Sequence, residues 1–137
     1  SGKGLEQFRK FVTAQGGNPA IVEDYSLFPQ AAHKAELKAD KDGYISGIAA
    51  RTIGLASQHT GAGRATKEDV IDLSAGVYLE KKVGDAVKKG DVLAVFYGND
   101  PKKLENGMNE AAKAFRITDE PADCPVLIKK IIGLSQE

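Results

Sequence analysis

The segment Lys81-Lys-Val-Gly-Asp-Ala-Val-Lys-Lys-Gly-Asp91 contains the pair Gly-Asp twice, once on each side of Val87. Glycine and aspartate are typical of tight turns, so two turns are expected around a buried valine. Before the segment, Val77 and Leu79 alternate with Tyr78 and Glu80. After it, residues 92–97 form a continuous apolar run of strand length. The pattern therefore predicts two strands joined by a compact β-element.

The residues on the N-terminal side of this element indicate further strands. Apolar and polar residues alternate over 36–39, Asp42-Gly43 signals a turn, and residues 44–48 resemble a strand. A hairpin or a sharp bend is expected at the turn. Downstream, residues 116–118 are expected to form a strand, and the apolar residues between Val126 and Ile132 are expected to finish the chain as a short helix or strand.

Three helices are expected from apolar periodicity and from residues typical of helix ends. Their expected limits are Ser1 as a cap with Gly16-Gly17 as the stop, Thr52 as a cap with Gly61 and Gly63 as the stop, and Asn99-Asp100-Pro101 as a start that continues to about Lys113. Residues 18–30 have no clear period and are expected to form an ordered connector. Together these elements predict a mixed α+β fold.

Composition excludes several classes of protein. Nineteen basic and nineteen acidic residues give a formal charge of zero, which argues against a nucleic-acid or membrane-surface binder. The apolar runs are far shorter than the roughly 20 residues that span a bilayer. Cys124 is the only cysteine, so no internal disulfide can form and a cytoplasmic location is expected. The start at Ser1, close to a helical pattern, suggests a fragment of a longer protein.

Two clusters could bind ions, but the alternatives are favoured. Residues 61–66 (GAGRAT) could present backbone N–H groups and the Arg64 guanidinium to a phosphate, although they match neither the Walker pattern nor the dinucleotide-binding pattern. A structural turn is the favoured interpretation. Glu68, Asp69 and Asp72 could bind a divalent cation, yet no second set of ligands follows, and a solvated turn is favoured.

Other reactive or charged residues suggest no site. His33 and His59 are the only histidines, and with one cysteine they are too few for a zinc site. Cys124 lies between Asp123 and Pro125 and is expected to be packed and inert. The lysine pairs 81–82 and 88–89 are expected on a solvated hairpin surface. The aromatic residues inside predicted strands are expected in the core rather than on a base-stacking platform: Tyr44, Tyr78, Phe96 and Tyr97.

Several longer motifs are more specific. They are Gly43-Tyr-Ile-Ser-Gly-Ile-Ala, Ile53-Gly-Leu-Ala, Gly61-Ala-Gly-Arg-Ala-Thr-Lys-Glu-Asp-Val-Ile-Asp72, Gly76-Val-Tyr-Leu-Glu-Lys-Lys-Val-Gly-Asp-Ala-Val-Lys-Lys-Gly-Asp-Val-Leu93 and Ile117-Thr-Asp-Glu-Pro121. In order and spacing, this series resembles the C-terminal domain of pyrimidine-nucleoside and thymidine phosphorylases. The opening Ser1-Gly-Lys-Gly with Gln15-Gly-Gly-Asn18 is also similar to that family, so the resemblance extends from Ser1 to about Ile132.

The resemblance implies an α/β-hammerhead, a mixed, mostly antiparallel sheet with flanking helices and a barrel-sandwich-like hairpin over residues 77–97. It implies that residues 1–34 are a helix and connector from the larger parent domain, and that residues 35–137 are the C-terminal domain. The parent would be a cytoplasmic homodimer that converts a pyrimidine nucleoside and phosphate to free base and pentose 1-phosphate. The family's phosphate loop and base-contacting residues have no counterpart here, so no catalytic, substrate-binding or metal residue and no cofactor is expected.

Two other functions remain open. Residues 83–93 also resemble half of a lipoyl or biotinyl carrier domain, but the acceptor position falls near Asn99 and Asp100, and Lys102-Lys103 come later in a predicted helix. Shared turn geometry explains that likeness. A stand-alone interaction module is the other alternative, because a basic pair beside a glycine loop can bind a partner.

Overall fold

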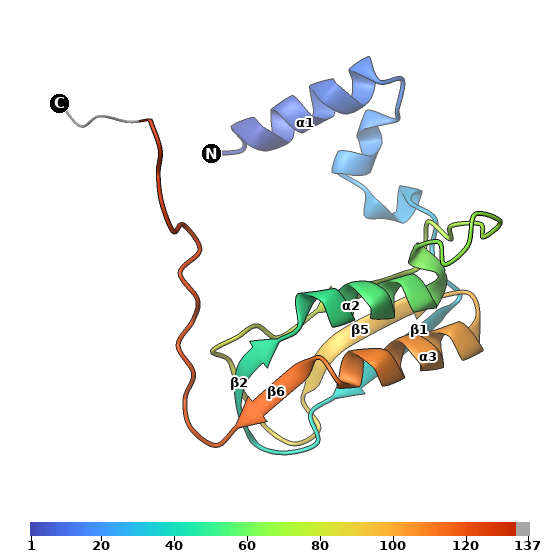
Figure 1. Cartoon of the computed structure of the whole chain (residues 1–137). Coiled ribbons are helices and arrows are strands. Elements are labelled where there is room, and N and C mark those ends of the chain that lie inside the picture. Colours follow the sequence, from blue (N-terminus) through green and yellow to red (C-terminus); the bar gives the residue numbers. More distant parts are fainter. Residues whose placement is uncertain (134–137) are drawn as a thin grey trace.

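A long antiparallel pairing forms the spine of the protein, whose computed structural model describes residues 1–133 (Figure 1). It begins where β1 (His33–Lys38) pairs with β5 (Val92–Gly98). Beyond a bend, it resumes where β2 (Gly43–Ile48) pairs with β4 (Ala86–Val87). Of the two expected alternatives at Asp42-Gly43, the bend is therefore right, because β1 and β2 lie in different sheets.

Two matching turns hold the spine together. In Lys82–Asp85 and in Lys88–Asp91, the third residue is a glycine with positive φ, 99° at Gly84 and 94° at Gly90. In each turn, the aspartate side chain accepts a hydrogen bond from the first residue's N–H, at 2.7 Å and 3.0 Å. The two predicted Gly-Asp turns are confirmed.

Each turn also forms backbone hydrogen bonds with the segment that lies opposite it in the antiparallel pairing. Gly84 N donates to Ile45 O at 2.8 Å, and Ile45 N donates to Asp85 O at 2.9 Å. Gly90 N and Asp91 O make the equivalent bonds with Ala39, at 2.9 Å and 2.8 Å. The pairing thus continues across the bend, so that residues 33–45 run antiparallel to residues 84–98.

One strand widens each end of the spine into a sheet. β3 (Gly76–Leu79) pairs with β5, and β6 (Phe115–Thr118) pairs with β2. The strand orders are β1-β5-β3 and β4-β2-β6, and every described pairing is antiparallel. The α+β class and the strands predicted near residues 77–79, 92–97 and 116–118 are confirmed.

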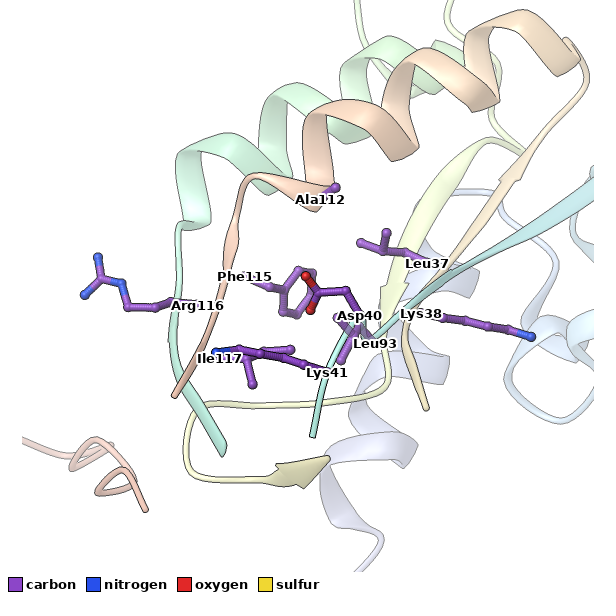
Figure 2. Close-up of a pocket in the computed structure, with 9 residues that line it drawn as sticks. All are labelled: Leu37, Lys38, Asp40, Lys41, Leu93, Ala112, Phe115, Arg116 and Ile117. Atoms are coloured by element: carbon purple, nitrogen blue, oxygen red, sulfur yellow. The ribbon is translucent and has the colours of Figure 1, made fainter. Parts of the chain in front are cut away.

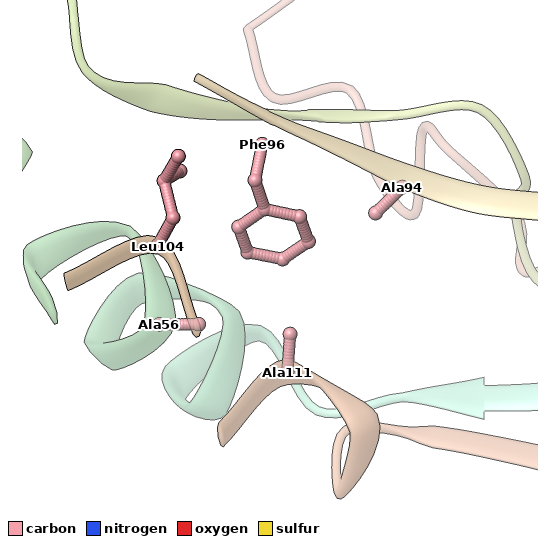
Figure 3. Close-up of a cluster of buried hydrophobic side chains, with 5 residues drawn as sticks. All are labelled: Ala56, Ala94, Phe96, Leu104 and Ala111. Atoms are coloured by element: carbon pink, nitrogen blue, oxygen red, sulfur yellow. The ribbon is translucent and has the colours of Figure 1, made fainter. Parts of the chain in front are cut away.

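Two helices cover one face of the β1-β5-β3 sheet. α2 (Ala50–Ser57) and α3 (Pro101–Ala112) pack side by side against it (Figure 1). Figure 3 shows Phe96 reaching from β5 into a cluster of small and aliphatic side chains: Ala56, Ala94, Leu104 and Ala111. Phe96 is fully buried, and truncating such a residue to alanine commonly costs about 3–5 kcal/mol.

A second cluster lies at the bend. It contains Ala39, Ile45, Val87 and Leu93. Val87 is buried, as expected from its position between the two turns. The bend is therefore stabilised by apolar packing as well as by backbone hydrogen bonds. Asp42 adds a further link, because its Oδ1 accepts a hydrogen bond from Lys89 N at 2.7 Å.

The N-terminal ends of α1 and α2 differ from the predicted ones. α1 (Lys3–Ala14) is preceded by Gly2, which makes no side-chain cap, so the expected cap at Ser1 is wrong by one residue. Thr52 lies inside α2, and Ala49 precedes that helix without a side-chain cap. The start of α2 is set instead by a tertiary contact, because Ala49 N donates to Ala114 O at 2.9 Å.

The third helix start is confirmed. Asp100 Oδ1 accepts hydrogen bonds from the N–H groups of Lys102 and Lys103, at 2.9 Å and 3.2 Å. This satisfies two of the donors that every helix start leaves without an intrahelical partner. Pro101 follows in the first turn, where it removes another such donor.

The N-terminal segment stands apart from both sheets (Figure 1). α1 is followed by two short 3₁₀ helices, η1 (Pro19–Val22) and η2 (Tyr25–Leu27). α1 packs with η1, where Arg9 pairs with Glu23. No residue of α1 is buried: Val12 is half-buried, and the other apolar side chains whose spacing predicted the helix, Leu5, Phe8 and Phe11, are exposed.

The C-terminal end corrects one more prediction. Residues 126–132 are irregular, neither helix nor strand, and the prediction of a regular element there is wrong. A short apolar segment needs a surface to cover it, and its large side chains are exposed in the described structure. Leu134, which ends the apolar run in the sequence, lies outside the described residues.

Gly107 is expected to be essential for the crossing of α2 and α3. A Cβ at this position would lie 2.8 Å from both Ala56 O and Thr60 Cγ2. Gly107→Ala should therefore lower the free energy of unfolding by about 1–3 kcal/mol, as overpacking does. Urea denaturation measures this. Gly54→Ala is the matched control: Gly54 is helical, with open space around it, and should gain up to about 1 kcal/mol. Equal effects of the two substitutions would contradict the close crossing.

Glycine is expected to be required at position 90 because of its backbone conformation and not because space is lacking for a side chain. Its φ is 94°, and a Cβ added at this position would meet no atom within 4 Å. Gly90→Val should cost about 1–3 kcal/mol through backbone strain. Gly76→Val is the control, because Gly76 lies in β3 in equally open space without a positive φ. An unchanged thermal midpoint in Gly90→Val would contradict the assigned turn.

Candidate functional site

The glycine-rich segment identified in the sequence forms a loop at the end of α2. A π-helical turn, η3 (Gln58–Ala62), extends α2 as far as Gly61, whose φ of 107° ends the helix. The predicted stop at the glycines is confirmed. The loop then returns to the body, where Asp72 N donates to Gly61 O at 2.9 Å.

The backbone donors of this loop already have an anionic partner. The N–H groups of Ala65 and Thr66 donate to Asp69 Oδ2 at 2.9 Å and 2.8 Å. These bonds, Thr66 first and then Ala65, lower the pKa of Asp69 below its usual value. A phosphate would have to displace this carboxylate to reach the same donors. The geometry favours the structural turn over an anion cradle.

The neighbouring acidic residues face different donors. Asp72 accepts hydrogen bonds from Ser74 N and Ser74 Oγ, at 3.0 Å and 2.7 Å, while Asp69 binds its own loop. Within residues 1–133, no three His, Cys, Asp or Glu residues come together as a group that could hold a metal ion. Asp69 and Asp72 thus serve as turn-stabilising acceptors.

Asn99 joins three segments beside this loop. Its Nδ2 donates to Asp72 Oδ2 at 2.9 Å and to Ser74 Oγ at 3.0 Å, and its Oδ1 accepts from Ala32 N at 2.8 Å. Ala32 ends the connector that leads into β1. The Asn99 junction therefore ties the N-terminal connector, the 61–75 loop and the start of α3 to one another. The sequence suggested Asn99 only as part of a helix start and gave no sign of this role.

A small hollow separates the loop from α3. It has a volume of about 220 Å³. Its lining residues are Gln58, His59, Gly61, Gly63, Ala65, Asp69, Val70 and Lys103. Arg64 is exposed and does not line it. Arg64 therefore does not contribute to this hollow, and the neighbouring backbone donors that the sequence suggested for a phosphate are engaged by Asp69.

A larger cleft of about 370 Å³ lies where the two sheets diverge (Figure 2). Leu37, Leu93 and Phe115 contribute apolar surface to it. Figure 2 shows that the side chains of Lys38 and Arg116, which also border it, point away from its centre in opposite directions. Lys38 and Arg116 therefore do not converge on one point, while Lys41, the third cation that lines the cleft, has its Nζ 3.9 Å from Asp119 Oδ1.

The remaining candidates from the sequence lie scattered. His33 begins β1, and His59 lies in the turn after α2. Cys124 is exposed, so the expectation that it is packed is wrong. It follows β6 in an irregular segment that passes the Lys82–Asp85 turn.

The aromatic residues divide between core and surface. Phe96 is fully buried, as expected, but Tyr78 and Tyr97 are 61% and 37% exposed, so the assignment of these two tyrosines to the core is wrong. Tyr78 opposes Val95 in the sheet register, which places it on the face opposite Phe96. The lysine pairs lie on the turns as expected, and Lys81 Nζ is 4.0 Å from Asp91 Oδ2.

No helix among residues 1–133 has the length and apolar character needed to cross a bilayer.

Comparison with known proteins shows that most of this chain is similar to one family. Residues 44–118 match the sequence pattern of the family described as "Pyrimidine nucleoside phosphorylase C-terminal domain". The matched region extends from β2 through β6, so it includes both Gly-Asp turns and the 61–75 loop.

Full-length relatives are similar over almost the whole chain. A pyrimidine-nucleoside phosphorylase of Geobacillus stearothermophilus is 45% identical over 93% of this chain and 29% of its own length. One from Bacillus subtilis is 46% identical over 96% of this chain and 30% of its own. One from Staphylococcus epidermidis is 42% identical, with the same coverage as the B. subtilis protein. The chain therefore spans less than a third of the length of these curated relatives.

Acidification is expected to weaken the Asn99 junction through Asp72. Hydrogen bonds from the Ser74 hydroxyl and then the Ser74 N–H lower the pKa of Asp72 from its ordinary 3.8. This stabilisation is complete above the unfolded pKa and is lost as the pH falls through the lowered folded pKa. Asp72→Asn should therefore lose less thermal stability than the wild type between about pH 5 and about pH 2.

Ser74→Ala provides an independent check of the same cause. It removes the main hydrogen bond to Asp72, so its melting temperature should also depend less on pH than that of the wild type. Both variants are measured by calorimetry in a pH series. If the melting temperatures of both variants changed with pH as steeply as that of the wild type, Asp72 would not contribute to acid sensitivity.

Proposed function

This chain belongs to the family of pyrimidine nucleoside phosphorylase C-terminal domains, and we propose that it is the C-terminal structural part of a longer phosphorylase. The observation that carries the proposal is the coverage. Relatives with that activity in their names align with 93–96% of this chain but only 29–30% of their own length. The reaction proposed for the whole protein is the reversible conversion of a pyrimidine nucleoside and phosphate to free base and (deoxy)ribose 1-phosphate.

Such a reaction makes two demands on the protein. The glycosidic C–N bond breaks while a phosphate oxygen forms a new bond to the same carbon, and the leaving base takes up negative charge. Catalysis then needs cations and N–H donors that position the phosphate, together with a donor that stabilises the departing base. We propose that these groups lie upstream of Ser1.

The 61–75 loop supports this assignment. Its backbone donors at Ala65 and Thr66 are engaged by Asp69, and the exposed Arg64 stands outside the adjoining hollow. Elsewhere in the described structure, Lys38 and Arg116 border the cleft between the two sheets, but their side chains point away from its centre. We therefore propose that residues 1–137 contain no catalytic, substrate-binding or metal residue, and that the chain alone is inactive.

The proposed role is mechanical support. Residues 1–34 are proposed to belong to the larger parent domain and residues 35–137 to form the C-terminal domain. The exposed apolar face of α1 supports that boundary, because a helix with such a face needs a partner surface. The rest of the parent chain is the proposed partner, within a cytoplasmic homodimer whose contacts lie mainly upstream.

The carrier function is not supported by the position of the lysines. Lys102 and Lys103 lie in the first turn of α3, beside the Asp100 cap. A carrier presents its modified lysine at the tip of a tight hairpin, where the modifying enzyme can reach an extended backbone. The interaction module becomes the better alternative only if the full-length protein proves not to be a phosphorylase.

The decisive assay compares the 137-residue chain with the full-length protein. Uridine or thymidine is incubated with phosphate, and release of free base is followed, after circular dichroism has verified that both proteins are folded. We expect turnover by the full-length protein alone. Turnover by the short chain would contradict the proposed absence of catalytic groups, and a lipoyl or biotinyl mass shift at Lys102 or Lys103 would favour the carrier function.

A further inference from the structure

An apolar segment leaves the folded body at the C-terminal end. After β6, the backbone passes the Lys82–Asp85 turn, where a Cβ at Gly84 would lie 3.4 Å from Ala122 O and 3.5 Å from Cys124 Cα. Beyond Cys124 the chain is irregular, and Figure 1 shows it running away from both sheets. Residues 125–132 are here called the tail. The segment after β6 is therefore in contact with the folded body as far as Cys124 and leaves it beyond that residue.

The tail is unusually apolar for exposed chain. Five large apolar side chains within seven residues are between 67% and 95% exposed: Val126, Leu127, Ile128, Ile131 and Ile132. A contiguous exposed apolar surface of this kind in a soluble protein commonly marks an interaction site. The tail also makes no backbone hydrogen bond with other described residues, so its peptide groups are available to a partner.

We propose that the tail is a docking segment, covered in the full-length protein by the upstream part of the same polypeptide. This inference rests on the proposed function. The relatives are more than three times as long as their match to this chain, and the family description places the match at the C-terminal end. The upstream part is thus the large body of protein that is covalently attached to this chain.

The opposite end of the chain indicates the same occupant. α1, through which the upstream part connects, exposes Leu5, Phe8 and Phe11. Between the two ends, the sheets and helices enclose their own clusters. Exposed apolar residues thus occur at both ends of the chain, as well as at Val70 and Leu73 in the 61–75 loop, and the exposure of the two ends is expected if both pack on one upstream body.

The tail sequence specifies the kind of surface that receives it. Eight extended residues span about 25 Å, enough to cross a groove on a neighbouring body. Lys129 and Lys130 interrupt the apolar residues, so the receiving groove is apolar with carboxylates along its rim. The free backbone groups fit addition of the tail to the edge of a sheet, a recurring mode of binding for an extended segment.

Thiol labelling tests the proposal in the full-length protein. A Leu127→Cys reporter is placed in a Cys124→Ser background, and alkylation at residue 127 is followed by peptide mass spectrometry. We expect alkylation at least tenfold slower in the full-length protein than in the 137-residue chain, at every protein concentration. Lys67→Cys in the same background is the control for reagent access, because Lys67 is exposed in the 61–75 loop. Equal rates at residue 127 in the two proteins would overturn the proposal.

Two further outcomes have defined meanings. Protection that appears in the 137-residue chain and grows with its concentration would overturn the proposal in favour of a second copy as the occupant. In a separate arm, Leu127→Asp should lower the melting temperature of the full-length protein and leave that of the 137-residue chain unchanged. A melting temperature that Leu127→Asp leaves unchanged in both the full-length protein and the 137-residue chain would also overturn the proposal. Neither readout depends on phosphorolysis, so the proposed function can fail while the docking stands, or the reverse.

Discussion

The antiparallel pairing of residues 33–45 with residues 84–98 is the constraint on which the structure depends. It passes through a bend and so belongs to two sheets at once. Strand hydrogen bonds alone cannot hold a register across a bend, because the ladder is interrupted there. Gly84 and Gly90 restore it by donating to Ile45 and Ala39, while their aspartates fix the turns. β3, β6 and both covering helices are then placed relative to this spine.

The sequence predicted the parts of the fold that depend on local chemistry. The Gly-Asp pairs, the apolar run in β5 and the Asp100 cap each act over a few residues, and each was confirmed. The errors arose where a distant contact decides the result. The start of α2 is set by Ala114, 65 positions after Ala49 in the sequence, and the tail is irregular although its apolar residues predicted a helix or strand.

Only part of the candidate site could be predicted from the sequence. The glycine stop at Gly61 and a turn at Asp69 could be read from the sequence, but it gave no sign that the Asp69 carboxylate accepts hydrogen bonds from the loop's own N–H groups. Asn99 gave no signal at all, since its partners Ala32 and Asp72 are distant in sequence. The resulting loop is internally satisfied. Such a loop suits a supporting domain, whereas a catalytic loop keeps donors free for its substrate.

The central claim is that this domain stabilises a phosphorylase and contributes no phosphate-binding group of its own. The most direct measurement is a phosphate titration of the 137-residue chain, followed by the NMR resonances of the Ala65 and Thr66 amides. We expect both resonances to stay in place, because Asp69 keeps these donors. Saturable shifts of both amides as phosphate is added would contradict the claim, and would identify the 61–75 loop as an anion site after all.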